Sequence, residues 1–159
     1  MLLNTGNNLD IVVMDSYGQR LWRSFNLPTD MVLPQQPMTR DTKLVSALAR
    51  GYLYSGFYTH FFDITNMQSL IYNNGPKIST VYWPKPYCKA WAYNTATYNN
   101  SQNGILDLKG LFVASDKFEA SDLDQEVMRR LTLDYDGNLR LYSLNATVAI
   151  GRSLGWHCT

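Results

Sequence analysis

The chain of 159 residues has a formal net charge of +1, only 17% charged residues, and many aromatic side chains, including 11 Tyr and 4 Trp. This length supports one sizeable core, or one domain with part of another. A near-neutral charge without a block of like charges argues against a nucleic acid partner, and no apolar run is long enough to predict membrane insertion of this chain. Met1 is not followed by a basic segment and an apolar core, so no secretory signal is visible.

Residues 1–33 alternate strand and turn signals. An apolar segment at residues 11–14 is followed by a turn at residues 15–18 and by a second strand that includes Trp22. Trp22 and Phe25 are expected to pack in a core, as large aromatic side chains usually do. The next segment, residues 34–50, begins with prolines and contains a short apolar run. It is predicted to be a linker and an entry strand.

The rest of the chain repeats short strand and turn units. The turns contain Asn-Gly, Lys-Gly and Asp-Gly pairs, and the segments between them are rich in β-branched and aromatic residues. This pattern predicts an all-β fold. Residues 121–128 are the one segment in which a turn of helix is expected.

One hairpin, at residues 131–142, stands out among these units. Its Asp136-Gly137 pair accepts the positive φ angles of a hairpin turn. The flanking segments alternate apolar and polar residues, which predicts strands with one buried face. The residues expected on that buried face are Leu131, Leu133, Leu139 and Leu141.

A second alternating series in the same hairpin is polar and consists of Asp134, Asp136, Asn138, Arg140 and Tyr142. Side chains two positions apart on a strand share a face. A carboxylate, an amide and a phenol in one row can hold vicinal sugar hydroxyls, each of which both donates and accepts hydrogen bonds. The alternative interpretation is the ordinary polar outer face of a strand.

The polar series resembles the mannose motif of the bulb-type (monocot mannose-binding) lectins, Gln-x-Asp-x-Asn-x-Val-x-Tyr. Asp136, Asn138 and Tyr142 match this motif, whereas Asp134 stands in place of the Gln and Arg140 in place of the Val. The resemblance implies a carbohydrate-binding site for a mannose-type glycan at Asp134, Asp136, Asn138 and Tyr142. Arg140 is expected either to block the apolar face of the sugar or to favour an anionic glycan.

A second resemblance lies in residues 21–34. They are similar to the signature Leu-Trp-x-Ser-Phe-x-x-Pro-Thr-Asp-x-x-Leu-Pro, which closes the first lectin domain of plant S-domain (G-type lectin) receptor-like kinases. The matching residues are Trp22, Ser24, Phe25, Pro28, Thr29, Asp30, Leu33 and Pro34. The following chain, to about Tyr142, resembles the second lectin-like domain and S-locus glycoprotein region of that family.

This resemblance implies a β-prism II fold, in which short antiparallel sheets surround a pseudo-threefold axis. Residues 1–33 are then the end of a first lectin domain, in which the sugar motif is damaged and no sugar site is expected. Residues 34–50 are a linker and entry strand, residues 51–150 are the second lectin-like or S-locus glycoprotein domain, and residues 151–159 are a divergent tail.

An internal repeat supports this fold. Residues 66–72 and residues 107–112 each repeat the turn and second strand of the hairpin at residues 131–142. In this alignment Leu70 and Tyr72 take the places of the last two residues of the polar series. Three such units correspond to the three sheets of a prism.

The resemblance implies a non-catalytic, carbohydrate-recognition-type extracellular module of a receptor-like kinase, with weak or lost sugar binding. Such a module lies on the extracellular face of the plasma membrane or is secreted. Two alternatives are a protein–protein interaction module, which binds a peptide ligand or a sister receptor and so mediates receptor dimerisation, and a truncated gene product without independent function. Asn99 and Asn145 are N-glycosylation acceptors in form.

Residues for enzymatic chemistry are not assembled in the sequence. His60 and His157 have no evident catalytic partner and are expected to be structural. Cys88 and Cys158 are too few for a disulfide framework and could either pair or stay free. The two Cys and two His are too scattered along the chain for a zinc knuckle. No Gly-rich nucleotide loop or kinase motif occurs, so we expect no cofactor, no metal and no enzymatic activity in this chain.

Overall fold

The computed structural model describes residues 2–4, 10–63, 67–83, 103–114, 117–124, 127–144 and 149–153. These residues form fifteen strands and one short 3-10 helix, η1 (Ser24–Asn26), which confirms the all-β prediction. The expected turn of helix at residues 121–128 was wrong. Residues 121–124 form turns, and a strand begins at Met128. No helix in the described part of the chain is long and apolar enough to cross a membrane.

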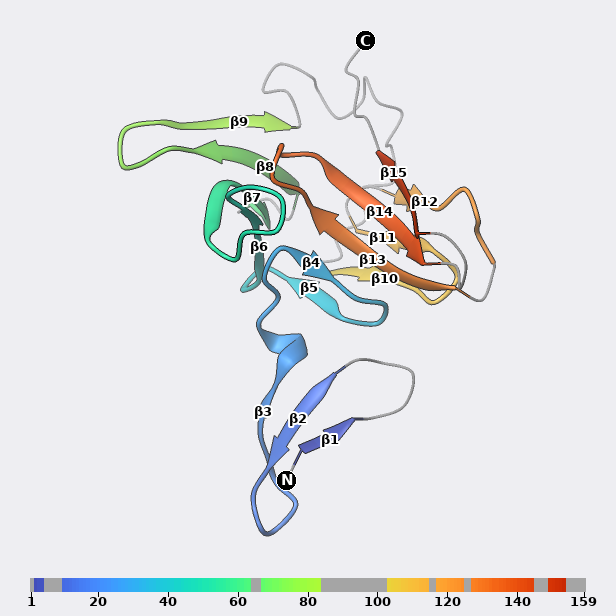
Figure 1. The fold of residues 1–159 in the computed structure, drawn as a ribbon. Helices are drawn as coiled ribbons and strands as arrows, with labels where there is room; N and C mark the ends of the chain where they lie inside the picture. The colour runs from blue at the N-terminus through green and yellow to red at the C-terminus, as the bar shows by residue number, and fades with distance from the viewer. Residues whose placement is uncertain are drawn as a thin grey trace.

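The strands form four antiparallel sheets (Figure 1). Sheet A contains β1 (Leu2–Asn4), β2 (Ile11–Met14) and β3 (Arg20–Arg23), in that order. Sheet B has the order β15 (Ala149–Ser153), β14 (Leu139–Leu144), β13 (Met128–Leu133) and β4 (Met31–Val32). Sheet C has the order β12 (Lys117–Glu119), β11 (Leu111–Val113), β10 (Asn103–Leu106) and β5 (Pro37–Thr39). Sheet D has the order β6 (Lys43–Ala47), β7 (Ser55–Phe62), β8 (Gln68–Asn73) and β9 (Ser79–Trp83).

Sheets B, C and D are connected by one pattern of strand order along the chain. The consecutive strands β4, β5 and β6 each enter a different sheet, and the later chain then completes the three sheets in reverse order with a meander of three strands each. Each entering strand carries one side chain with 0% exposure, namely Val32, Met38 and Leu44. Three consecutive strands therefore connect the three sheets, and the rest of each sheet comes from later parts of the chain.

The central hairpins of these three sheets have the same length. A five-residue connection joins the last paired residues, which are Phe62 and Gln68 in sheet D, Leu106 and Phe112 in sheet C, and Leu133 and Leu139 in sheet B. All six side chains are buried. The internal repeat therefore exists as three equivalent hairpins.

The register of the repeat differs from the sequence-based alignment by one residue. Counting from the connection places Ser69, not Leu70, at the position of Arg140. Leu70 is only 2% exposed and belongs to the core, like its equivalent Leu141. A shift of one residue moves a strand's side chains to the opposite face, so Ser69 and Ile71 occupy the positions equivalent to Arg140 and Tyr142, and the polar series is not repeated on β8.

One apolar core lies between sheets B, C and D. The alternation predicted for residues 131–142 is confirmed, because all four leucines are buried there. The stacked rings of Phe112 and Phe118, with centroids 5.5 Å apart, add to this core from sheet C. The cluster consists of Val32, Met38, Leu44, Phe62, Leu70, Leu106, Phe112, Ala114, Phe118, Leu131, Leu133, Leu139 and Leu141.

Sheet A lies apart from this body and is joined to it through η1 (Figure 1). Phe25 is 3% exposed, as expected for a core residue, but Trp22 is 42% exposed. The expectation for Trp22 was wrong because β3 is an edge strand, with no described strand beyond it to cover its side chains.

Backbone hydrogen bonds link the segment after η1 to the main body. The carbonyl oxygens of Thr29 and Asp30 accept hydrogen bonds from Val45 N at 2.9 Å and Leu133 N at 2.8 Å. Gln36 Nε2 donates to Phe25 O at 3.1 Å. Residues 34–50, expected to be a linker and an entry strand, contain β5 and β6 and so contribute to two sheets of the body.

Candidate functional site

The candidate site lies at the connection between β13 and β14. Asp134 N donates to Asn138 O at 2.9 Å, and Gly137 N donates to Asp134 O at 2.9 Å, so the five residues form a closed turn. Gly137 has a φ of 81°, which an L side chain rarely adopts and which glycine accepts without strain. The glycine predicted from the Asp-Gly pair is therefore required by the backbone.

Sheet D supports this turn from the side. Tyr82 OH on β9 donates to Gly137 O at 2.5 Å. The Tyr58 ring on β7 packs so closely that a Cβ at position 137 would lie 2.6 Å from the ring carbon Cδ1. Tyr58 and Tyr82 also contact each other edge to face, with ring centroids 5.7 Å apart. Sequence reasoning missed both tyrosines, since nothing local in the sequence connects them to residue 137.

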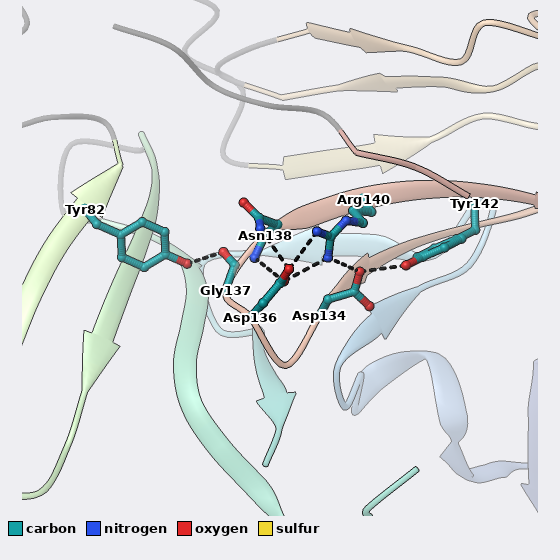
Figure 2. Close-up of polar contacts among 7 residues, drawn as sticks. All are labelled: Tyr82, Asp134, Asp136, Gly137, Asn138, Arg140 and Tyr142. Atoms are coloured by element: carbon teal, nitrogen blue, oxygen red, sulfur yellow. Dashed lines mark hydrogen bonds and ion pairs between the residues drawn. The ribbon is translucent and has the colours of Figure 1, made fainter. Parts of the chain in front are cut away.

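The polar series lies in a row, as the spacing predicted, and its side chains bond to one another (Figure 2). Arg140 occupies the middle of the row. Its Nη1 donates to Asp134 Oδ2 at 2.6 Å and to Asp136 Oδ1 at 2.8 Å, and its Nη2 donates to Asp136 Oδ2 at 2.7 Å. The guanidinium therefore holds both carboxylates, one of them through two parallel bonds, which is a strong geometry for such a pair.

The remaining members of the row join the same network. Tyr142 OH donates to Asp134 Oδ2 at 2.7 Å, and Asn138 Nδ2 donates to Asp136 Oδ2 at 3.0 Å. Arg130 places its guanidinium carbon 5.1 Å from the centroid of the Tyr142 ring. Each of the five side chains in the row thus has at least one partner within the row.

The charges in this network reinforce one another. The hydrogen bonds from Arg140 lower the pKa of Asp136 to about 2, and the Asp136 carboxylate in turn raises the pKa of the Arg140 guanidinium. Burial, and donation of its proton to Asp134, raise the pKa of the Tyr142 phenol. At neutral pH the row therefore contains an ionised Asp136, a protonated Arg140 and a neutral Tyr142.

This arrangement limits what the row can bind. A neutral sugar would have to replace hydrogen bonds between charged groups, which are stronger than those it could offer in return. An anionic sugar would approach a guanidinium that is already neutralised by two carboxylates. The side chains of these carboxylates, Asp134 and Asp136, are 17% and 35% exposed, so they would also repel the anion. The geometry therefore makes Arg140 the residue on which access to the row depends.

Equivalent turns elsewhere in the chain use their aspartates differently. Asp15 Oδ1 accepts hydrogen bonds from Tyr17 N and Gln19 N, both at 2.9 Å. Asp107 Oδ1 accepts from Lys109 N at 2.9 Å and Leu111 N at 2.8 Å.

Asp134, at the same place in its own turn, bonds to Arg140 and Tyr142 instead. The turn amide Asn138 N donates to Asp136 Oδ1 instead, at 3.1 Å. In this turn the carboxylate of Asp136 accepts the turn amide, and the carboxylate of Asp134 holds the side chains of Arg140 and Tyr142.

The other residues singled out from the sequence do not belong to this row. His60 is fully buried, and its Nε2 lies 3.0 Å from Gln68 Oε1, which is consistent with a structural role. Within the described ranges, no three His, Cys, Asp or Glu side chains are grouped so that they could hold a metal ion. The other predicted positions lie outside the described residues, and they are Cys88, Asn99, Asn145, His157 and Cys158.

Comparison with known proteins gives two relatives, while no family model matches the chain. The chain is 41% identical over 129 residues to the receptor protein kinase ZmPK1 of Zea mays, covering 77% of this chain and 15% of the relative. It is 26% identical over 139 residues to a G-type lectin S-receptor-like serine/threonine-protein kinase of Arabidopsis thaliana, covering 84% of this chain and 15% of that relative. The chain thus spans about 15% of the length of the curated relatives that it matches, and these homologues are plant receptor-like kinases.

Proposed function

We propose that this chain is a non-catalytic recognition module from the extracellular part of a plant receptor-like kinase. The observation that carries the proposal is the 41% identity to a maize receptor kinase across 77% of the chain, confined to 15% of that kinase. Such a module faces the outside of the plasma membrane and recognises a ligand there.

The proposed architecture is a β-prism II domain made of sheets B, C and D. The shared pattern of strand order, the three equivalent five-residue connections and the common core support it. In this proposal sheet A is the last sheet of a preceding lectin domain. The sequence suggested that this preceding domain ends at residue 33, but β4 (Met31–Val32) pairs with β13 of sheet B, so we propose a boundary before Met31.

For the ligand, we propose that the residues of the mannose motif in the row 134–142 keep the arrangement needed to bind mannose, but that Arg140 blocks access to them. The support is the network itself, in which this guanidinium holds both carboxylates through three hydrogen bonds. A ligand would have to break these bonds before it could reach Asp134 or Asp136. Sugar binding by the natural chain is therefore expected to be negligible.

The test is titration with mannose and with an acidic sugar, followed by calorimetry or NMR, for the natural chain and for Arg140→Val. We expect no saturable binding by the natural chain and binding of mannose by the variant. Each hydrogen bond to a neutral hydroxyl contributes only about 0.5–1.5 kcal/mol. The dissociation constant of the variant for mannose should therefore be roughly millimolar, which corresponds to a binding free energy of about −4 kcal/mol.

Arg130→Val is the matched control, because it removes an exposed arginine that contacts the Tyr142 ring without touching either carboxylate. It should leave mannose binding absent. Binding of the acidic sugar by the natural chain would contradict the proposed closure. A folded Arg140→Val variant that binds no mannose would show that the arrangement of the mannose-motif residues is lost as well.

That last result would favour the second candidate function, recognition of a protein or peptide ligand. The observation in its favour is independent of the row: large apolar side chains are exposed in the connection between β6 and β7. Contiguous exposed apolar surface of this kind is typical of interaction sites.

A further inference from the structure

The connection between β8 and β9 is another five-residue turn, at the tip of a hairpin that projects from the body (Figure 1). It is closed in the same way as the turns that begin with Asp15 and Asp107, because Asn74 N donates to Ile78 O at 2.9 Å. Asn74 therefore occupies the position that aspartate has in those turns. All residues from 73 to 80 are exposed, so water reaches the whole tip.

The side chain of Asn74 is not held as those aspartates are. Asp15 and Asp107 each accept a hydrogen bond from the backbone amide two residues further on. In the β8–β9 turn that position is Pro76, which has no amide proton to donate. Within the described ranges the Asn74 side chain makes no hydrogen bond, so its amide carbon is free to approach the backbone.

Gly75, the next residue, has an accessible backbone nitrogen. This nitrogen donates to no described residue, and no atom lies within 4 Å of the position that a Cβ would take. Glycine has no side chain that would hinder an attack by its nitrogen. In an Asn-Gly pair the glycine nitrogen can bond to the asparagine Cγ and close a five-membered succinimide, and the side-chain nitrogen leaves as ammonia. Water then opens the ring at either carbonyl, which gives aspartate or isoaspartate.

The chain has a second Asn-Gly pair, Asn103-Gly104, in a different environment. Gly104 is buried in β10, which pairs with β5 on one side and β11 on the other. A Cβ at this glycine would lie 2.6 Å from the Phe112 ring carbon Cζ. The extended backbone must therefore open locally before the Gly104 nitrogen can turn back onto the Asn103 side chain.

The Asp136-Gly137 pair, which could close the same ring by losing water, is also protected. Gly137 N donates to Asp134 O at 2.9 Å, so the attacking nitrogen is already bonded. The Asp136 carboxylate is ionised and is bound by both terminal nitrogens of Arg140. Of the three pairs in which Asn or Asp precedes Gly, only the pair at the β8–β9 tip has both reacting groups available within the described structure.

We propose that Asn74 is a site of spontaneous deamidation, in which Gly75 N attacks Asn74 Cγ and the residue becomes aspartate or isoaspartate. Water is the only co-reactant. Lys77 is the one formally charged residue between positions 73 and 80, so the new carboxylate changes the charge of the tip from +1 to 0. Isoaspartate also adds a carbon to the backbone of the turn. The modification is independent of the row at residues 134–142 and of any ligand.

The experiment incubates the folded full chain in a mildly alkaline buffer, which favours loss of the proton from the attacking nitrogen. Peptide mapping by mass spectrometry detects each converted asparagine by the mass difference between water and ammonia, and fragmentation assigns it to one residue. We expect Asn74 to be converted at least about tenfold faster than Asn103, because β10 must open before Asn103 can react. The product at Asn74 should contain both aspartate and isoaspartate.

The matched control is the same chain unfolded in denaturant, in which Asn74 and Asn103 should react at similar rates because each precedes a glycine. Asn73 is a control within the same turn and should stay intact, since the nitrogen that would attack it, Asn74 N, donates to Ile78 O. A folded chain in which Asn103 or Asn73 reacts as fast as Asn74 would overturn the proposal. It would also be overturned if Asn74 stays intact in the folded chain while the unfolded chain reacts at both Asn-Gly pairs.

Discussion

The β2–β3 turn of sheet A and the β13–β14 turn of sheet B have the same backbone and different surroundings. Each runs for five residues, begins with Asp and contains a glycine with φ near 80°. Gly18 in sheet A has no atom within 4 Å of its Cβ position, whereas Gly137 in sheet B is packed against the Tyr58 ring. The turn is therefore a local element, while its packing and side-chain chemistry come from the neighbouring sheets.

The glycines offer the sharpest way to test this difference. Both Gly18→Ala and Gly137→Ala place a side chain at positive φ, which costs about 1 kcal/mol. Gly137→Ala must in addition displace Tyr58, so we expect it to lower the free energy of unfolding by about 3–4 kcal/mol in all. Denaturant unfolding of the two variants measures both costs. Equal destabilisation would show that contact with sheet D contributes nothing to the turn.

Acid should act on the main body through His60, which is buried in sheet D. Burial lowers its pKa to about 4, although the hydrogen bond with Gln68 opposes the shift. The unfolded chain takes up the proton near pH 6.5 and the folded chain does not. Stability is therefore complete above pH 6.5 and falls by about 3 kcal/mol as the pH drops to 4.

Denaturant unfolding between pH 7 and pH 4 measures this fall. His60→Gln cannot titrate, and it should lose most of the slope even if it starts from a lower stability. The lower end of this window overlaps the titration of carboxyl groups, so the slope that remains in His60→Gln, which keeps those groups, measures their share. A natural chain with constant stability over the window would contradict the assignment.

Hydrogen exchange should show a smaller difference, in the opening free energies of amides in sheet A and sheet B. Sheet A has three strands, and Trp22 is exposed on its edge strand β3. None of the side chains described in β2 and β3 belongs to the shared core. We expect amides in β2 and β3 to open with a free energy about 2 kcal/mol below that of β13 and β14, which is roughly thirtyfold faster exchange. Equal protection in both sheets would mean that sheet A and the main body unfold as one unit.

Some features of this chain follow from its sequence alone. The alternation of leucines in residues 131–142 was sufficient to predict which side chains are buried, because strand periodicity is a property of the local backbone. The Asp-Gly pair likewise predicted a turn that needs positive φ at Gly137. The same two signals, repeated along the chain, were sufficient for the all-β class.

Other features were decided only by tertiary structure, because they depend on residues far apart in the chain. The entry of β4, β5 and β6 into three different sheets leaves no local pattern, and neither does the bond from Tyr82 to a residue 55 positions away. The exposure of Trp22 depends on the absence of a further described strand beyond β3. The sequence placed Arg140 in the polar row, but its capture of both carboxylates follows from the turn that brings Asp134 and Asp136 around it.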